Sequence, residues 1–373
     1  MTTQPASPDG TLAAPTSPHP GVFSQLSMTD RFLSVWILLA MLGGLFVGRI
    51  LPDLADWLDH VKLDNTSLPI ALGLFGMMYP VFARVRYERL RSVTRDTRFL
   101  ALALVLVWVV APLLMFTLAW IFLPDSPEYR TGIILIGIAP CLGMVLVWNR
   151  LAGGDEEAAA VLLVVNAAIQ VLAFPFLAYF YAHVLPGLLG LEQQDLTVRF
   201  LDIARSVLIF LGGPLLVGFV TQWFGRARRR DDWYDQRFLP RMDKIPLLSL
   251  LFTIVVMFAV QGDRITNEPG DVARIALPLV AYFAIMWTLG VASGRAAGYG
   301  YPRRTALAFT AAGNNFELAI AVAIATFGVT SKVALAGTVG PLIEVPALVF
   351  LVYVALWLKD RVTRGIAQPA VLG

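Results

Sequence analysis

The stretch "GIAPCLGMVLVWN", residues 137–149, lies in the middle of an apolar segment long enough to cross a membrane. It places Pro140 beside Cys141, the single cysteine of the chain, with Gly137 and Gly143 on either side. Proline removes a backbone donor and clashes with the preceding helical turn. We therefore expect this helix to break here and its second half to begin near Cys141. Unpaired backbone groups at membrane depth are tolerated only where they line a cavity or are covered by protein, so the break predicts a site.

The composition is that of a polytopic membrane protein. Of 373 residues, 57% are hydrophobic and 15% are charged, and the mean hydropathy is +0.70. Soluble domains carry about a quarter charged residues, so these values exclude an ordinary soluble protein. A bilayer core requires roughly 20 apolar residues per helix. Ten segments meet this length: residues 32–51, 66–85, 99–122, 131–151, 158–183, 203–224, 243–262, 275–294, 305–328 and 332–358.

The arginines predict the orientation, because Lys and Arg are retained on the cytoplasmic side. Residues 84–98 and 226–241 are rich in arginine, whereas the connections 52–67 and 123–130 are acidic or nearly neutral. An even number of spans with both termini cytoplasmic agrees with every connection. The expected organisation is a disordered cytoplasmic tail without a signal peptide (1–30), two five-helix halves (31–185 and 186–358) and a cytoplasmic C-terminal tail (359–373).

The two halves resemble each other weakly. "LGGLFVG" (42–48) corresponds to "LGGPLLVG" (211–218), and "LPIALGLF" (68–75) corresponds to "IPLLSLLF" (245–252). Because each half has an odd number of spans, the second half is expected to be inverted relative to the first. Inverted repeats are typical of secondary transporters, whose substrate site lies at the membrane midplane between discontinuous helices.

The repeat predicts a second broken helix, and the ninth segment contains one at "AAGNNFELA" (311–319). There Gly313, Asn314 and Asn315 interrupt an apolar span, and asparagine side chains offer hydrogen bonds that compete with the helix. The predicted fold is therefore all-α, with ten transmembrane helices in two inverted repeats. The fourth and ninth helices are broken and cross at the midplane.

Polar residues lie near the midpoints of four spans: Cys141, Gln170, Glu317 and Glu344. The two glutamates are the acidic residues deepest in the predicted spans. An uncompensated charge there costs about 2.5–3.5 kcal/mol on insertion scales, which makes both functional candidates. Structural alternatives remain open: Cys141 as a small buried hydrophobe, Glu344 as a protonated structural acid, and Asn166 and Gln170 as interhelical contacts.

Three stretches resemble a known family: "GIAPCLGMVLVWNRLAGGD" (137–155), "GNNFELAIAVAIATFG" (313–328) and "GPLIEVPALVFLV" (340–352). They are similar to arsenite permeases of the arsenical-resistance type, in the bile acid, arsenite and riboflavin transporter superfamily. The similarity runs from the first predicted helix to the tenth. The resemblance implies efflux of trivalent arsenic driven by proton entry, with antimonite as a second candidate substrate. The family's essential cysteine corresponds to Cys141 and its essential glutamate to Glu317.

Two positions depart from family patterns. Many members carry arginine before the cysteine, where this chain has Pro140. Sodium-coupled bile acid relatives carry glutamine four residues after the ninth-helix acid, where this chain has Ala321, which favours a proton as the coupling ion. The expected site comprises substrate-binding residues (Cys141 as the metalloid ligand, Asn314, Asn315, Glu317, Gln170), proton-coupling residues (Glu317, Glu344) and helix breaks (Pro140, Gly143, Gly313).

The chemistry of arsenite is compatible with one cysteine. Arsenite at neutral pH is a small uncharged trihydroxide, so its site needs a soft ligand and hydrogen-bonding groups. Three thiols would hold arsenic tightly, whereas one thiol gives an exchangeable bond that suits an exporter. A buried glutamate can take up and release a proton as the cavity changes sides.

Three other functions agree less well with the sequence. A sodium-coupled organic anion carrier on the same fold would need cationic or amide groups for the anion, and no Arg or Lys lies near the predicted midplane. An intramembrane enzyme would need a paired acid and base, and the histidines (19, 60, 183) lie in the tail or at predicted extracellular ends. A channel fits paired broken helices less well than alternating access does. We expect a non-enzymatic transporter in the cell membrane whose partners are arsenite, a proton and the bilayer, with no cofactor and no nucleic acid.

Overall fold

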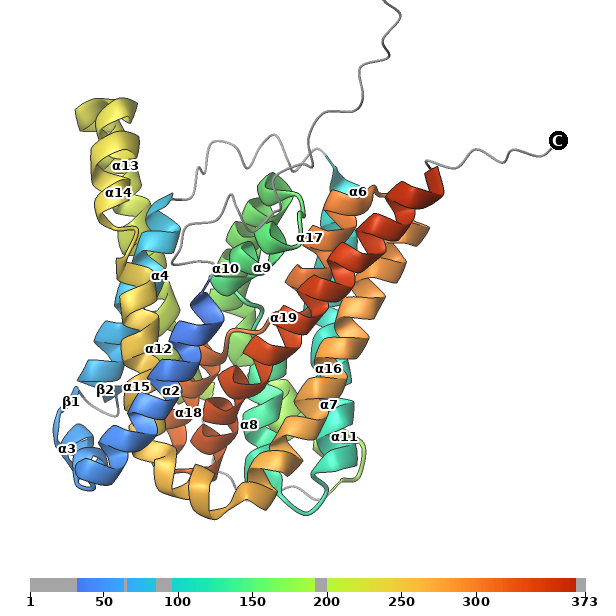
Figure 1. Cartoon of the computed structure of the whole chain (residues 1–373). Helices are drawn as coiled ribbons and strands as arrows, with labels where there is room; N and C mark the ends of the chain where they lie inside the picture. Colours follow the sequence, from blue (N-terminus) through green and yellow to red (C-terminus); the bar gives the residue numbers. More distant parts are fainter. Residues whose placement is uncertain (1–31, 64–65, 85–95, 192–199, 367–373) are drawn as a thin grey trace, which may run out of the picture.

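The computed structural model describes residues 32–63, 66–84, 96–191 and 200–366. The predicted N-terminal tail, most of the arginine-rich segment after the second span, and the last seven residues lie outside these ranges, so the expectations for them stay predictions. The described chain is a bundle of long helices with one small antiparallel ribbon, β1 (Lys62–Leu63) and β2 (Thr66–Ser67) (Figure 1).

In chain order the helices are α2 (Leu33–Ile50), α3 (Leu54–His60), α4 (Leu68–Arg84), α6 (Thr97–Val105), η3 (Leu106–Val110), α7 (Ala111–Phe122), α8 (Pro127–Gly137), α9 (Met144–Leu151), α10 (Glu156–Tyr179), η4 (Phe180–Val184), α11 (Leu185–Leu188), α12 (Phe200–Val207), η5 (Leu208–Gly212), α13 (Gly213–Trp233), η6 (Tyr234–Phe238), α14 (Leu239–Arg241), α15 (Ile245–Asn267), α16 (Pro269–Ala296), α17 (Tyr301–Ala312), α18 (Phe316–Phe327) and α19 (Lys332–Ile366). Each predicted apolar span falls on one of these helices or on a run of consecutive ones. Most ends shift by a few residues, whereas α13 and α19 extend eight or nine residues beyond the predicted ends at 224 and 358.

Within the described residues, six helical runs are long and apolar enough to cross a bilayer: Thr97–Phe122, Glu156–Leu188, Phe200–Arg226, Tyr234–Asn267, Pro269–Ala296 and Lys332–Asp360. Three shorter apolar helices, α2, α4 and α18, accompany them. Their outer faces carry exposed large apolar side chains, such as Phe46, Leu72 and Leu172, which suit contact with lipid. The chain is therefore a polytopic α-helical membrane protein.

The π-helical turns η3 to η6 have a common cause in the sequence. Each ends two residues before a proline, and these prolines are Pro112, Pro186, Pro214 and Pro240. A proline inside a helix lacks an N–H and clashes with the carbonyl one turn earlier. A locally widened turn relieves that clash and lets the helix continue. These prolines consequently lie within continuous helical runs.

The helices pack as two groups (Figure 1). The first group consists of α2, α4, α13 and α15. The second consists of α6 to α10 and α16 to α19, with α12 packing against α10 and α18. The two groups lie at opposite sides of the molecule in Figure 1, with the first group in blue and yellow.

Glycines allow close helix approach in the first group. A Cβ at Gly48 of α2 would lie 2.3 Å from the Ala259 carbonyl oxygen of α15, and one at Gly44 would lie 2.6 Å from the Val255 oxygen. Small residues of this kind let backbones approach closely where the hydrophobic effect between membrane helices is absent. The α2–α15 pair is consequently one of the tightest in the molecule.

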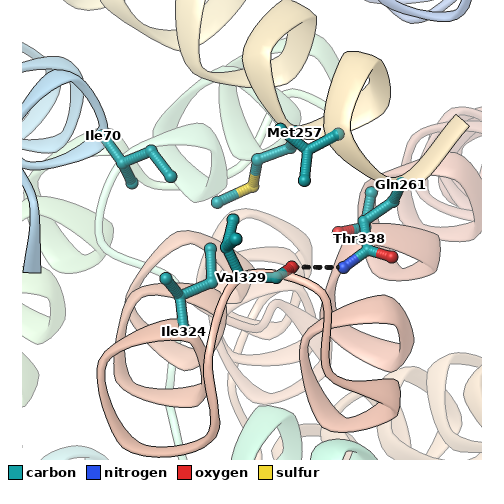
Figure 2. A pocket seen from close by; sticks show the side chains of 7 residues that line it. Ile70, Met257, Gln261, Ile324, Val329 and Thr338 are labelled. Carbon is teal, nitrogen blue, oxygen red and sulfur yellow. Dashed lines mark hydrogen bonds between the residues drawn. The ribbon is translucent and has the colours of Figure 1, made fainter. Parts of the chain in front are cut away.

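One side-chain hydrogen bond joins the two groups near the end of α18. The Gln261 amide of α15 donates to the Val329 carbonyl oxygen at 2.6 Å (Figure 2). Ile70 and Met257 from the first group and Ile324 from the second line a small cavity beside this bond. The contact between the groups here is mostly apolar.

Candidate functional site

The two predicted breaks are present, and they pair with each other. α8 ends at Gly137 and α9 begins at Met144, while α17 ends at Ala312 and α18 begins at Phe316. The Cys141 N–H donates to the Gly313 carbonyl at 3.0 Å, and the Asn315 N–H donates to the Ala139 carbonyl at 2.6 Å. These bonds join the two segments as a short antiparallel bridge centred on Pro140 and Asn314. Backbone groups that the breaks release are therefore satisfied by the opposite break.

Pro140 occupies the position of this bridge where no N–H is needed. In an antiparallel pair, alternate residue pairs exchange no hydrogen bonds, and Pro140 and Asn314 form such a pair because the bonds come from their neighbours. The missing donor of proline therefore costs nothing here. The expectation that the second half-helix begins near Cys141 is wrong: α9 begins at Met144. Residues 139–141 lie outside the helix, because their backbone groups bond to the other break.

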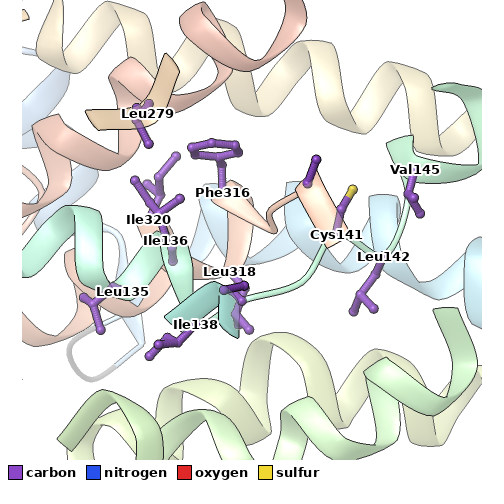
Figure 3. Packing of buried hydrophobic residues seen from close by; sticks show 14 of the residues in the cluster. Leu135, Ile136, Ile138, Cys141, Leu142, Val145, Leu279, Phe316, Leu318 and Ile320 are labelled. Carbon is purple, nitrogen blue, oxygen red and sulfur yellow. The ribbon is translucent and has the colours of Figure 1, made fainter. Parts of the chain in front are cut away.

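Close packing explains the glycine of the second break. A Cβ at Gly313 would lie 2.9 Å from the Cys141 Cβ, closer than side chains normally approach. A Cβ at Gly143 would meet no atom within 4 Å. Figure 3 shows the Cys141 and Leu142 side chains on opposite sides of the segment that joins α8 to α9. Gly313 is thus required by its contact with the cysteine, whereas Gly143 borders open space.

Two half-helices begin at the crossing point. Asn315 caps α18, since its side-chain oxygen accepts from the Leu318 N–H at 3.0 Å. Gly143 precedes α9 and provides no side-chain cap. The backbone amides of Gly143 and Val145 instead interact with the Cys141 sulfur. The N-terminal ends of helices carry partial positive charge, so both half-helices turn a positive end toward this point.

The two glutamates lie beside the crossing point. Glu317 is in the first turn of α18 and is partly buried, and Glu344 on α19 is 3% exposed. The Glu344 carboxyl lies beside the Asn314 backbone N–H and interacts with it electrostatically. Electrostatic interactions also link Cys141 with both glutamates and the glutamates with each other. The structure therefore brings together Cys141, Glu317 and Glu344 from three separate spans.

Several buried polar atoms have no hydrogen-bond partner among the described residues. At the crossing point these are Nδ2 of Asn314, Nδ2 of Asn315 and Oε1 of Glu344, and on α10 they are both amide atoms of Gln170. Buried polar groups are almost always paired, so a cluster of unpaired ones indicates a place for a polar ligand or water. Gln170 is fully buried on α10, which packs against α9 and α17, and no described side-chain bond ties it to the crossing point.

Sequence reasoning missed Tyr282 of α16. Its hydroxyl donates to the Asn314 side-chain oxygen at 3.1 Å, and the residue is 1% exposed. A tyrosine within an apolar helix usually finds a partner for its hydroxyl, and that was the available signal. Nothing local in the sequence identifies that partner, because the bond spans 32 positions.

Comparisons with known proteins identify the family of the chain. Residues 71–268 match the model of the sodium bile acid symporter family. Arsenical-resistance protein Acr3 of Corynebacterium glutamicum is 48% identical over 338 residues, which cover 91% of each chain. The uncharacterized transporter slr0944 of Synechocystis is 33% identical over 346 residues, which cover 88% of each chain.

A second arsenical-resistance protein Acr3, from Alkaliphilus metalliredigens, is 29% identical over 337 residues, covering 87% of this chain and 92% of its own. The similarity to these proteins extends over nearly all helices, including both breaks. The chain belongs to the sodium bile acid symporter family of membrane transporters and, within it, to the arsenite permeases of the arsenical-resistance type.

Proposed function

We propose that this transporter exports arsenite from the cytoplasm in exchange for protons, with antimonite as a second substrate. The observation that carries the proposal is the meeting of the single thiol, Cys141, with Glu317 and Glu344 where two broken helices pair. The 48% identity to an arsenical-resistance protein supports the substrate. Both termini are then cytoplasmic and the protein lies in the cell membrane, as the arginine-rich connections favour.

The proposed binding step uses the thiol as a soft ligand. The Cys141 sulfur replaces one hydroxyl of the arsenite trihydroxide, and the thiol proton leaves with that hydroxyl as water. The reverse reaction with water releases arsenite on the other side. A single sulfur–arsenic bond can exchange, whereas several thiolates would retain the metalloid. Asn314, Asn315 and Gln170 are proposed to contribute hydrogen bonds to the remaining hydroxyls.

Glu317 is the proposed proton carrier, with Glu344 as a second coupling residue. Glu317 is partly exposed and lies in the first turn of α18, so a proton can reach it, whereas Glu344 is buried against Asn314. Ionisable groups inside a membrane protein typically mark ion and proton paths. Because the family model is that of sodium symporters, sodium is the alternative coupling ion and an outcome of the experiment below.

The packing supports two inverted five-helix halves. α15, the second span of the second half, packs on α2, the first span of the first half. Reciprocally, α13 from the first span of the second half packs on α4, the second span of the first half. Likewise α19 packs on α8 as α17 packs on α10. Such reciprocal packing agrees with a transporter whose site lies between repeats.

Everted membrane vesicles test this function directly. An acidic lumen should drive arsenite uptake, whereas a sodium gradient should not. Glu317→Gln should abolish the proton-driven uptake because its side chain stays neutral. Glu128→Gln is the matched control, since Glu128 lies near Lys332 at a helix end, 3.8 Å from its ammonium group, and should transport normally. Uptake driven by sodium alone would overturn proton coupling, and no uptake by the wild-type protein would overturn the proposed substrate.

A further inference from the structure

Tyr282 contacts the side chain of Asn314, and Glu344 lies beside its backbone N–H. The Tyr282 hydroxyl donates to Asn314 Oδ1 at 3.1 Å and lies 3.5 Å from the Ala311 carbonyl oxygen. The Glu344 carboxyl lies beside the Asn314 backbone N–H and interacts with it electrostatically. That N–H is not used in the bridge, because Asn314 belongs to the pair that exchanges no backbone hydrogen bonds.

These contacts leave one hydrogen-bond donor of Asn314 and one acceptor of Glu344 without a partner in the described part of the chain. The two atoms, Asn314 Nδ2 and Glu344 Oε1, are both buried. Asn314 is 1% exposed and Glu344 is 3% exposed, so bulk water does not compensate for the missing bonds. An amide has one oxygen and one NH₂ group. With the oxygen held by Tyr282, the NH₂ group must point elsewhere as a donor.

A neutral hydroxyl group complements this pair. Its oxygen can accept from Asn314 Nδ2 and its hydrogen can be donated to Glu344 Oε1. A fully ionised oxyanion can only accept, and it would place negative charge beside a carboxyl. The pair therefore suits an undissociated acid that keeps its hydroxyl hydrogens.

We propose that Asn314 and Glu344 form a hydroxyl-binding subsite for the neutral trihydroxide, and that Tyr282 is the positioning residue that aims the Asn314 amide into it. This inference rests on the proposed function, because it names how that site recognises its substrate. It also gives Glu344 a role in substrate recognition beside its proposed role as a second coupling residue, with Glu317 as the proton carrier.

The experiment measures arsenite uptake into vesicles as KM and maximal rate. Tyr282→Phe should raise KM about two- to tenfold, as expected for the loss of one hydrogen bond that orients a donor, with the maximal rate little changed. Tyr79→Phe is the matched control: its hydroxyl donates to Thr221 at 3.3 Å within the other helix group, and its KM should equal that of the wild type.

A double-mutant cycle separates positioning from general packing. Asn314→Ala should raise KM at least as much as Tyr282→Phe does, and the combined variant should be no worse than Asn314→Ala alone, because Tyr282 acts through Asn314. Asn314→Asp keeps the oxygen that accepts from Tyr282 and removes the donor, so its KM should rise as well. Additive effects of the two substitutions, or wild-type KM in Asn314→Asp, would overturn the subsite. If the wild type itself transports no arsenite, the proposed function fails instead.

Discussion

The two broken helices meet at one point but end their half-helices differently. In the second break, the Asn315 side chain caps α18 through the Leu318 N–H, and only residues 313–315 separate the two halves. In the first break, residues 138–143 separate α8 from α9, and Gly143 offers no side-chain cap. The backbone amides of Gly143 and Val145 there interact with the Cys141 sulfur.

The two breaks differ in how the N-terminal amides of their second half-helices are satisfied. The capped break satisfies its own helix end, so it forms a fixed frame against which the other break is paired. In the uncapped break, the backbone amides at the start of α9 interact with the Cys141 thiol. A helix end that lacks a side-chain cap is normally satisfied by water, a ligand or a neighbouring group. This difference agrees with the proposed roles, in which the first break carries the exchangeable ligand and the second break maintains the geometry of the site.

The largest expected effect is on the uncapped break. Cys141→Ser preserves size and removes the soft ligand, so arsenite transport should fall to the background level while expression stays normal. Resistance of a sensitive host to arsenite, together with membrane expression, measures this. Normal resistance in a well-expressed variant would remove the ligand role from Cys141.

The contact between the breaks should respond strongly to a single methyl group. Gly313→Ala places a Cβ 2.9 Å from that of Cys141 and should destabilise the protein by about 1–3 kcal/mol, the usual cost of overpacking. Gly143→Ala adds a Cβ in open space and should cost at most about 1 kcal/mol. Thermal unfolding in detergent compares the two. Equal losses would mean that the breaks are not in contact as described.

The capped break allows stability and binding to be separated. Asn315→Ala removes the cap of α18 and should cost about 1 kcal/mol of stability. Asn315→Ser retains a capping oxygen but loses the amide donor, so it should unfold like the wild type while showing a raised KM for arsenite. If Asn315→Ser unfolds as early as Asn315→Ala, the cap is not what Asn315 contributes.

Pro140 should be the least sensitive position for stability. Pro140→Ala leaves both flanking backbone bonds in place, and the greater freedom of the unfolded chain should cost no more than about 1 kcal/mol. Unfolding in detergent measures this, with Pro80→Ala in the interior of α4 as a comparison. A loss as large as that of Gly313→Ala would show that proline itself maintains the break.

The sequence predicts the features that depend on local chemistry. Apolar runs locate the spans, and Pro140 and the Gly313–Asn315 segment locate the breaks, because proline, glycine and asparagine act on their own helix. The start of α9 could not be predicted, since it depends on the hydrogen bond from Cys141 to Gly313, 172 positions apart in the chain. Tyr282 was missed for the same reason. The proximity of Glu317 and Glu344 to Cys141 was expected from their depth in the spans, and their roles remain predictions.

The burial of the only cysteine gives the native protein its own reporter. Cys141 is 5% exposed and no other residue of the chain carries a thiol. A membrane-impermeant, thiol-selective reagent added to the unmodified protein can therefore react at one atom only, and only while the crossing point is open to its side. The rate of that reaction measures the fraction of time for which the site is open. Applied from each side of the membrane in turn, it would compare the two open states of the transport cycle without any engineered label.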